Sequence, residues 1–442
     1  MGPMDLYFDV RDIFRAPRLA LSGKKILIFM IGNLGGFILY WVFSYLSLAL
    51  AGVSFSDAIN QYGLYPCLFG NEAGWIAWIT YFIGVEAWIL AIYLACTAVT
   101  RVTLKQLKGN DFFSAGDAWK YVCKHWHPVV FAPISIVLII VFFMVFAGIF
   151  AFMGKIPYLG EFIFAFPYLF YFFGSVFTIY TAFVLLVSLH YTPAIVGTYE
   201  EDTMGTVFQS YSITWSQPWR VIAYHIVLIP LLLISVYLFS WVWKAGFDLI
   251  NYVFGCNWFM GAKLSGMVNY ATSLVCPGWL CSFFAECIGC LTGCFNICFQ
   301  SCLTFLSCSV PTTSGPLSGS ETVAGVLLAI SIFLVGLSIL SYGLSIISVG
   351  ETLMFIIFKK KSDDDDLLQR KDEDELEEDM DDEYNFDDND NEDGSDDSED
   401  GLEDDTTEDE SPLDDINSGD DSDSDESPSD DIDSGDDSDP IE

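Results

Sequence analysis

Six long apolar runs constrain this chain more than any other feature. They lie at about residues 26–50, 75–99, 128–153, 162–190, 221–243 and 323–358. Each is long enough to supply the roughly 20 apolar residues that an α-helix needs to cross the hydrocarbon core of a bilayer. A helix also satisfies its backbone hydrogen bonds internally, which lipid surroundings require. The chain is therefore expected to be all-α, a polytopic integral membrane helix bundle with six spans.

Charge is distributed as unevenly as hydrophobicity. Residues 1–361 contain 16 acidic and 17 basic side chains, whereas residues 362–442 contain 43 acidic and two basic ones. The acidic part has almost no large apolar side chains, so it cannot bury a core and is expected to be disordered. We therefore divide the chain into an N-terminal amphipathic interfacial segment (1–25), a transmembrane domain (26–361) and a disordered Asp/Glu/Ser-rich tail (362–442).

The lysines and arginines predict the orientation of the spans, because cytoplasmic loops carry an excess of them. With six spans and a cytoplasmic N-terminus, 16 basic residues are cytoplasmic and only Lys155, Lys244 and Lys263 lie outside. A further crossing by the weaker apolar stretch at 271–310 would move the tail to the outer side. We therefore expect residues 271–310 to be re-entrant or interfacial and both termini to be cytoplasmic. The kind of membrane is left open.

Three short segments with helical periodicity lead into the first, third and fifth spans. Each places apolar side chains along one helix face and is followed by a proline: Pro17, Pro128 or Pro218. Amphipathic helices with aromatic and basic residues lie in the membrane interface. The pattern predicts three copies of an interfacial helix followed by a transmembrane hairpin. The general enrichment of aromatic and basic residues at membrane boundaries is the alternative explanation.

Four ionisable residues in the apolar runs are candidates for a transport pathway: Glu86, Glu351, His190 and His225. Glu86 lies near the middle of the second span, where a carboxylate costs at least ~2.5–3.5 kcal/mol and has to be protonated, paired or hydrated. A neutral Glu86 that is hydrogen-bonded inside the bundle is the structural alternative. Glu351 is close enough to the lysines after the last span to reach the membrane boundary. The two histidines lie near the ends of spans four and five.

Cysteines are concentrated in the weaker apolar stretch. Five of them repeat at intervals of three or four residues, which predicts a stripe along one helix face: Cys287, Cys290, Cys294, Cys298 and Cys302. Their spacing matches no common iron–sulfur run, and no nearby histidine completes a zinc set. Apolar packing is the favoured explanation, and disulfides to another segment, thiol lipidation or metal binding are the alternatives. No resident metal or cofactor is predicted.

The acidic tail suggests the leading functional hypothesis. Its charge suits basic proteins or divalent cations and excludes nucleic acid as its partner. Ser422, Ser424 and Ser427 lie among acidic residues and are phosphorylation candidates. The sequence contains no catalytic motif. We expect a non-enzymatic membrane anchor or scaffold whose cytoplasmic tail binds basic partners or cations. The alternatives are a transporter or channel that uses Glu86, and a tail that only solubilises.

Overall fold

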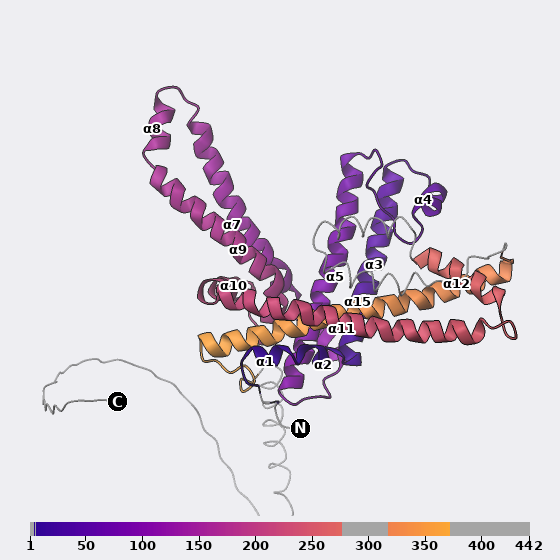
Figure 1. Ribbon diagram of the computed structural model, residues 1–442. Coiled ribbons are helices and arrows are strands. Elements are labelled where there is room, and N and C mark those ends of the chain that lie inside the picture. Colours follow the sequence, from indigo (N-terminus) through magenta and orange to yellow (C-terminus); the bar gives the residue numbers. More distant parts are fainter. Residues whose placement is uncertain (1–3, 5, 276–316, 372–442) are drawn as a thin grey trace, which may run out of the picture. The chain divides into compact units, whose positions relative to one another are not determined.

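Figure 1 shows the computed structural model, which describes residues 4, 6–275 and 317–371. Within these residues the regular secondary structure is entirely helical, which confirms the all-α prediction. Six helices are long and apolar enough to cross a membrane: α3 (Gly23–Leu50), α5 (Trp75–Leu107), α7 (Trp126–Met153), α9 (Tyr168–Tyr199), α11 (Pro218–Phe254) and α15 (Gly319–Ser362). The chain is therefore a multi-pass integral membrane protein, as its apolar runs predicted.

The boundaries of the spans differ from the prediction where helices continue past the apolar run. Helix α5 runs to Leu107, and its last turns carry Arg101 and Lys105. The predicted fourth span begins too early, because residues 162–165 belong to the separate short helix α8 (Leu159–Ala165). Pro167, the N-cap of α9, separates the two helices. Apolarity marks the part of a helix that suits lipid, whereas backbone hydrogen bonds define its full length.

Short helices precede three of the long ones, in the order that the three segments predicted. They are α1 (Val10–Ile13) and α2 (Ala16–Ala20) before α3, α6 (Ala115–Lys124) before α7, and α10 (Thr203–Ser216) before α11. The Ser114 hydroxyl caps α6 by accepting a hydrogen bond from the Asp117 amide, and the Asp202 carboxylate caps α10 by accepting one from the Gly205 amide. Each of these three long helices therefore follows one short helix or a pair of them.

The outer face of α10 shows how such a short helix is oriented. Met204, Phe208 and Trp215 are exposed, whereas Thr206 and Ser210 are completely buried. The side that packs on the protein is thus made of small hydroxyl and branched apolar side chains, and the largest apolar side chains face outward. An outward apolar face on a short helix is the arrangement that an interfacial helix needs.

Glycines allow the first hairpin to pack closely. A β-carbon on Gly32 would lie 2.8 Å from the Ala95 β-carbon, and one on Gly36 would lie 2.6 Å from Cδ1 of Trp88. The backbones of α3 and α5 therefore approach each other closely. Small residues spaced four apart on one helix allow such close packing between membrane helices. Gly32 and Gly36 are therefore helix-packing positions of the first hairpin. A second hairpin, α7 and α9 joined through α8, is visible in Figure 1.

The contact predicts the effects of two neighbouring substitutions. We expect Gly36→Ala to destabilise the protein by about 1–3 kcal/mol, because the added methyl group overpacks the contact with Trp88. Gly35→Ala is the matched control, since a β-carbon there meets nothing within 4 Å. Thermal unfolding in detergent measures both variants. Equal losses of stability would contradict the close approach.

Most of the buried core lies where one end of α5, α9 and α15 meet. We call this region the junction and define it by residues 95–107, 191–198 and 345–359, which are almost continuously buried. Helices α2, α3 and α11 also pack on α15. The rest of the long helices carries many exposed apolar side chains, as lipid-facing surfaces do.

Two ion pairs show which parts of the chain meet. Lys361 Nζ lies 2.6 Å from Asp9 Oδ1, so the N-terminal segment and the end of α15 lie together, in agreement with an even number of spans. Lys263, in α12 (Ala262–Val275), lies 3.7 Å from Glu321 at the start of α15. The two ends of the segment between Lys263 and Glu321 therefore lie close together. The re-entrant path of residues 271–310 stays a prediction, because 276–316 lie outside the described residues.

Candidate functional site

Glu86 is exposed on the surface of α5, beside the exposed side chains of Phe82, Ile83, Ile89 and Leu90. Among the described residues, none forms a hydrogen bond or an ion pair with it. Helical periodicity explains this placement, since the opposite face of α5 packs on α3. A transport pathway through Glu86 would need a polar group from another span opposite the carboxylate, and the described helices do not supply one.

Glu351 is buried in α15 at the junction and is only 5% exposed. Its position near the lysines at the end of α15 suggested that it reaches the membrane boundary. In the structure the last turns of α15 pack against α2, α5 and α9, so the carboxyl group lies inside the helix bundle. Tyr93, Cys96 and Tyr191 lie within electrostatic range of its carboxyl group. In the part of the chain that the structure describes, no hydrogen bond or ion pair involves this group.

His190 and His225 lie side by side, although no sequence spacing connected them. Their ring centroids are 5.9 Å apart with the planes at 89°, and His225 lies at the same distance from the ring of Tyr191. Each Nδ1 faces the carbonyl of the residue one turn earlier, at 2.9 Å for His190 and 2.7 Å for His225. A carbonyl only accepts, so Nδ1–H donates and Nε2 of each ring stays an acceptor.

Hydroxyl groups connect the helices next to Glu351. Thr352 donates to the Thr100 hydroxyl at 3.2 Å, and Ser348 donates to the Cys96 carbonyl at 3.1 Å. A β-carbon on Gly197 would lie 2.7 Å from Cγ2 of Thr100, so α9 approaches α5 closely at the same level. Sequence reasoning did not identify this network. Its signal is the recurrence of Ser and Thr at helical spacing near the ends of α5 and α15.

Arg101 is completely buried at the end of α5. Its Nη2 lies 2.7 Å from Oε1 of Glu200, which follows α9 in the left-handed conformation with φ of +59°. Its guanidinium carbon lies 4.4 Å from the ring centroid of Tyr121, whose hydroxyl donates to the Val196 carbonyl at 2.6 Å. The sequence interpretation counted Arg101 only as a positive residue of a loop. The structure instead makes it a link between α5, α6 and α9.

The acidic segment begins with residues that are packed on the junction. We call residues 363–371 the tail root. Lys359 Nζ lies 2.5 Å from Oδ2 of Asp363, and the Tyr199 hydroxyl donates to Oδ2 of Asp365 at 3.1 Å. Leu367 is 2% exposed and belongs to the same core cluster as the end of α15. The prediction that the disordered tail starts at residue 362 is therefore wrong for the tail root.

The basic residues of the tail root explain the rest of its attachment. The guanidinium of Arg370 lies 4.3 Å from the ring centroid of Tyr199, and Lys108 Nζ donates to the Arg370 carbonyl at 2.5 Å. Sequence reasoning counted Arg370 and Lys371 only as the two cations of the acidic part. After Lys371 the sequence contains 39 acidic residues and no lysine or arginine.

Carboxylates at this end of the molecule are held in their ionised form. Hydrogen bonding to Lys359 lowers the pKa of Asp363, and hydrogen bonding to Lys361 lowers the pKa of Asp9, each from an ordinary 3.8. A carboxylate whose pKa is lowered in the folded protein stabilises the fold at pH values above its ordinary pKa. This stabilisation is lost as the pH falls through the lowered pKa. Both ion pairs are therefore complete at neutral pH.

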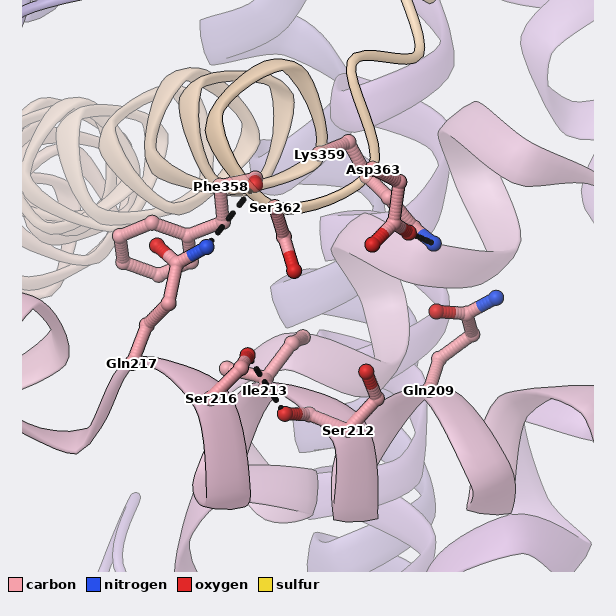
Figure 2. Close-up of a pocket in the computed structure, with 9 residues that line it drawn as sticks. All are labelled: Gln209, Ser212, Ile213, Ser216, Gln217, Phe358, Lys359, Ser362 and Asp363. Carbon is pink, nitrogen blue, oxygen red and sulfur yellow. Dashed lines mark hydrogen bonds and ion pairs between the residues drawn. The ribbon is translucent and has the colours of Figure 1, made fainter. Parts of the chain in front are cut away.

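Figure 2 shows a small pocket between α10 and the start of the tail root. Its lining residues are Gln209, Ser212, Ile213, Ser216, Gln217, Phe358, Lys359, Ser362 and Asp363. Its empty volume is only about 220 Å³, and that figure includes space open to solvent. Gln217 Nε2 donates to the Phe358 carbonyl at 3.1 Å across its edge. This region therefore connects α10 with the end of α15 and is too small for a substrate chamber.

Other candidate residues lie outside the described residues. These are the cysteine stripe from Cys287 to Cys302 and the serines Ser422, Ser424 and Ser427. Within the described ranges, no three or more His, Cys, Asp or Glu side chains are arranged to hold a metal ion. No protein-family model, curated protein or solved structure matches the chain.

Proposed function

We propose that this multi-pass membrane protein is a non-enzymatic anchor or scaffold whose acidic tail binds basic proteins or divalent cations in the cytoplasm. The observation that carries the proposal is the docking of the tail root. Asp363, Leu367 and Arg370 attach the base of the tail to the ends of the spanning helices that form the junction. An attachment of this kind holds the start of the polyanion at a fixed place on the membrane protein.

Charge supports the same proposal. The two basic residues of the acidic part both lie in the tail root, so the sequence beyond it is purely anionic. A polyanion attracts basic partners and cations through long-range electrostatic forces. Salt limits the range of this attraction to a Debye length of about 8–10 Å at 0.10–0.15 M ionic strength. The anionic inner leaflet repels such a chain, which keeps it available to cytoplasmic partners. The cytoplasmic location of both termini, based on the distribution of lysine and arginine, is part of the proposal.

Binding by the purified protein tests the proposal. Full-length protein in lipid nanodiscs is compared with a chain that ends at Lys371, with a lysine-rich peptide and Ca²⁺ as separate probes. We expect the full-length protein to bind the peptide with an affinity that falls as salt rises, and the shortened chain to lose this binding. The shortened chain keeps the tail root, so the junction stays intact. Equal binding by both chains would contradict the anchor proposal.

A transporter or channel that uses Glu86 is the weaker candidate. Its carboxylate is exposed on α5, and no described residue forms a polar contact with it. A Glu86→Gln variant with unchanged growth or flux would make Glu86 a structural residue. The hydroxyl groups that link the described helices gather near Glu351 instead.

A further inference from the structure

We propose that the exposed face of α5 around Glu86 is the contact surface for a second copy of this chain, with the two Glu86 carboxyl groups paired at its centre. The inference goes beyond the anchor proposal and does not depend on the acidic tail. It starts from the place of Glu86, which is exposed on α5 and takes part in no hydrogen bond or ion pair with any described residue.

Glu86 differs from the rest of the apolar runs in being both acidic and exposed. The six runs contain only two acidic residues and no lysine or arginine. The other acidic residue, Glu351, is buried in the junction, whereas Glu86 faces outward near the middle of the second run. An ionisable side chain at such a depth is costly. The hydrocarbon core offers it neither a donor nor an acceptor, so another protein surface is the natural source of its partner.

The exposed residues around Glu86 have the spacing of a helix-packing seam. They recur at alternating intervals of three and four residues, and all of them are exposed: Ile76, Ile79, Ile83, Glu86 and Leu90. A repeat of this kind keeps one face of a helix against a partner helix over several turns, as in a left-handed coiled coil. We call these five residues the α5 seam. Its only polar member is Glu86, which lies between apolar residues on both sides.

The opposite face of α5 holds the seam in place. Ala77, Tyr81 and Gly84 are buried on that side, and a β-carbon on Gly84 would lie 2.7 Å from the Phe43 β-carbon of α3. Helix α3 therefore fixes the rotation of α5 about its own axis. The described helices leave the α5 seam uncovered, so it is a preformed surface of the first hairpin.

Apolar side chains alone would not select a partner for the α5 seam, because lipid tails are as apolar as isoleucine and leucine. Glu86 supplies the selectivity. Hydrogen bonds between polar side chains contribute to the association of membrane helices. A single polar residue within an apolar seam also fixes the register and the number of helices that pack together. The seam therefore specifies a partner that has a polar group at the depth of Glu86.

A second copy meets this requirement without any further condition. The distribution of lysine and arginine gives every copy the same orientation in the membrane, so the α5 helices of two copies are parallel and carry Glu86 at the same depth. A two-fold axis along the membrane normal then brings the same surface of both copies together. A carboxyl group that holds its proton donates one hydrogen bond and accepts another. Each Glu86 side chain therefore satisfies the other across the axis.

The association of full-length protein in lipid vesicles tests the proposal. Fluorescently labelled copies are diluted stepwise with lipid, and energy transfer between them gives the dissociation constant of the pair. We expect Glu86→Leu to raise this constant about 3- to 30-fold, the effect of one hydrogen bond between membrane helices. Glu86→Gln keeps a donor and an acceptor, so its constant is expected to stay within about threefold of the native one. A native chain that is monomeric at every dilution, or a Glu86→Leu pair as tight as the native pair, overturns the proposal.

A photo-reactive amino acid in place of Phe82, one turn from Glu86, identifies what lies on the seam. We expect it to cross-link two full-length chains to each other. The same group in place of Leu138, which is exposed on α7, is the matched control and is expected to leave the chains single. A cross-link from position 82 to another segment of the same chain overturns the proposal, because the chain itself would then cover the seam. Capture of lipid alone at both positions overturns it as well.

Discussion

Replacing Arg101 with alanine is expected to lower the free energy of unfolding by about 3–5 kcal/mol. The guanidinium is completely buried, and its loss leaves the mostly buried carboxylate of Glu200 without its 2.7 Å partner. The contact with the ring of Tyr121 is lost as well, and such contacts contribute about 0.5–2 kcal/mol. Unfolding in detergent, followed by tryptophan fluorescence, measures the change.

Two further variants separate the roles of Arg101. Arg101→Lys keeps the charge but loses the planar group that stacks on Tyr121, so we expect it to recover only part of the stability. Arg220→Ala is the matched control, because Arg220 is exposed and its removal should change stability by no more than about 0.5 kcal/mol. If Arg101→Ala is as stable as Arg220→Ala, the buried link between α5, α6 and α9 does not contribute to folding.

Replacing Leu367 with alanine is expected to weaken the docking of the tail root by about 2–5 kcal/mol. Leu367 is 2% exposed, so the substitution leaves a cavity at the junction. Trypsin cleavage after Arg370 measures the docking, since a docked root protects this bond. A loss of about 2 kcal/mol raises the undocked fraction roughly 30-fold and accelerates cleavage accordingly.

A matched control exists one residue away. Leu368 is only half-buried, so Leu368→Ala should accelerate cleavage less than Leu367→Ala. The carbonyl of the bond that trypsin attacks belongs to Arg370 and accepts a hydrogen bond from Lys108 Nζ in the docked root, so undocking is needed for cleavage. If both leucine variants are cleaved at the rate of the native chain, the tail root is not held by this apolar contact.

Periodicity and apolar length were sufficient to predict the elements of this fold. Six runs of about 20 or more apolar residues became six long helices, and short amphipathic segments became α1, α2, α6 and α10. These properties are local, because they depend on residues within one or two helical turns.

The candidate sites could not be predicted in the same way, because they depend on which helix ends meet. Arg101 and Glu200 are almost a hundred residues apart, and only their buried contact distinguishes Arg101 from other loop arginines. The burial of Glu351 could not be predicted either, because its distance in sequence from Lys359 does not show that α5 and α9 enclose it. The tail root had one local signal, the pair Leu367–Leu368 in an otherwise acidic stretch.

Cross-linked co-purification from native membranes tests the central claim most directly. The full-length protein is compared with the chain that ends at Lys371, which retains Leu367 and Arg370 at the junction. The anchor account predicts a defined set of basic proteins that appear only with the full-length chain and remain bound at moderate salt. Identical sets of proteins with both chains would contradict it, because the tail would then recruit nothing and would act only as a solubilising segment.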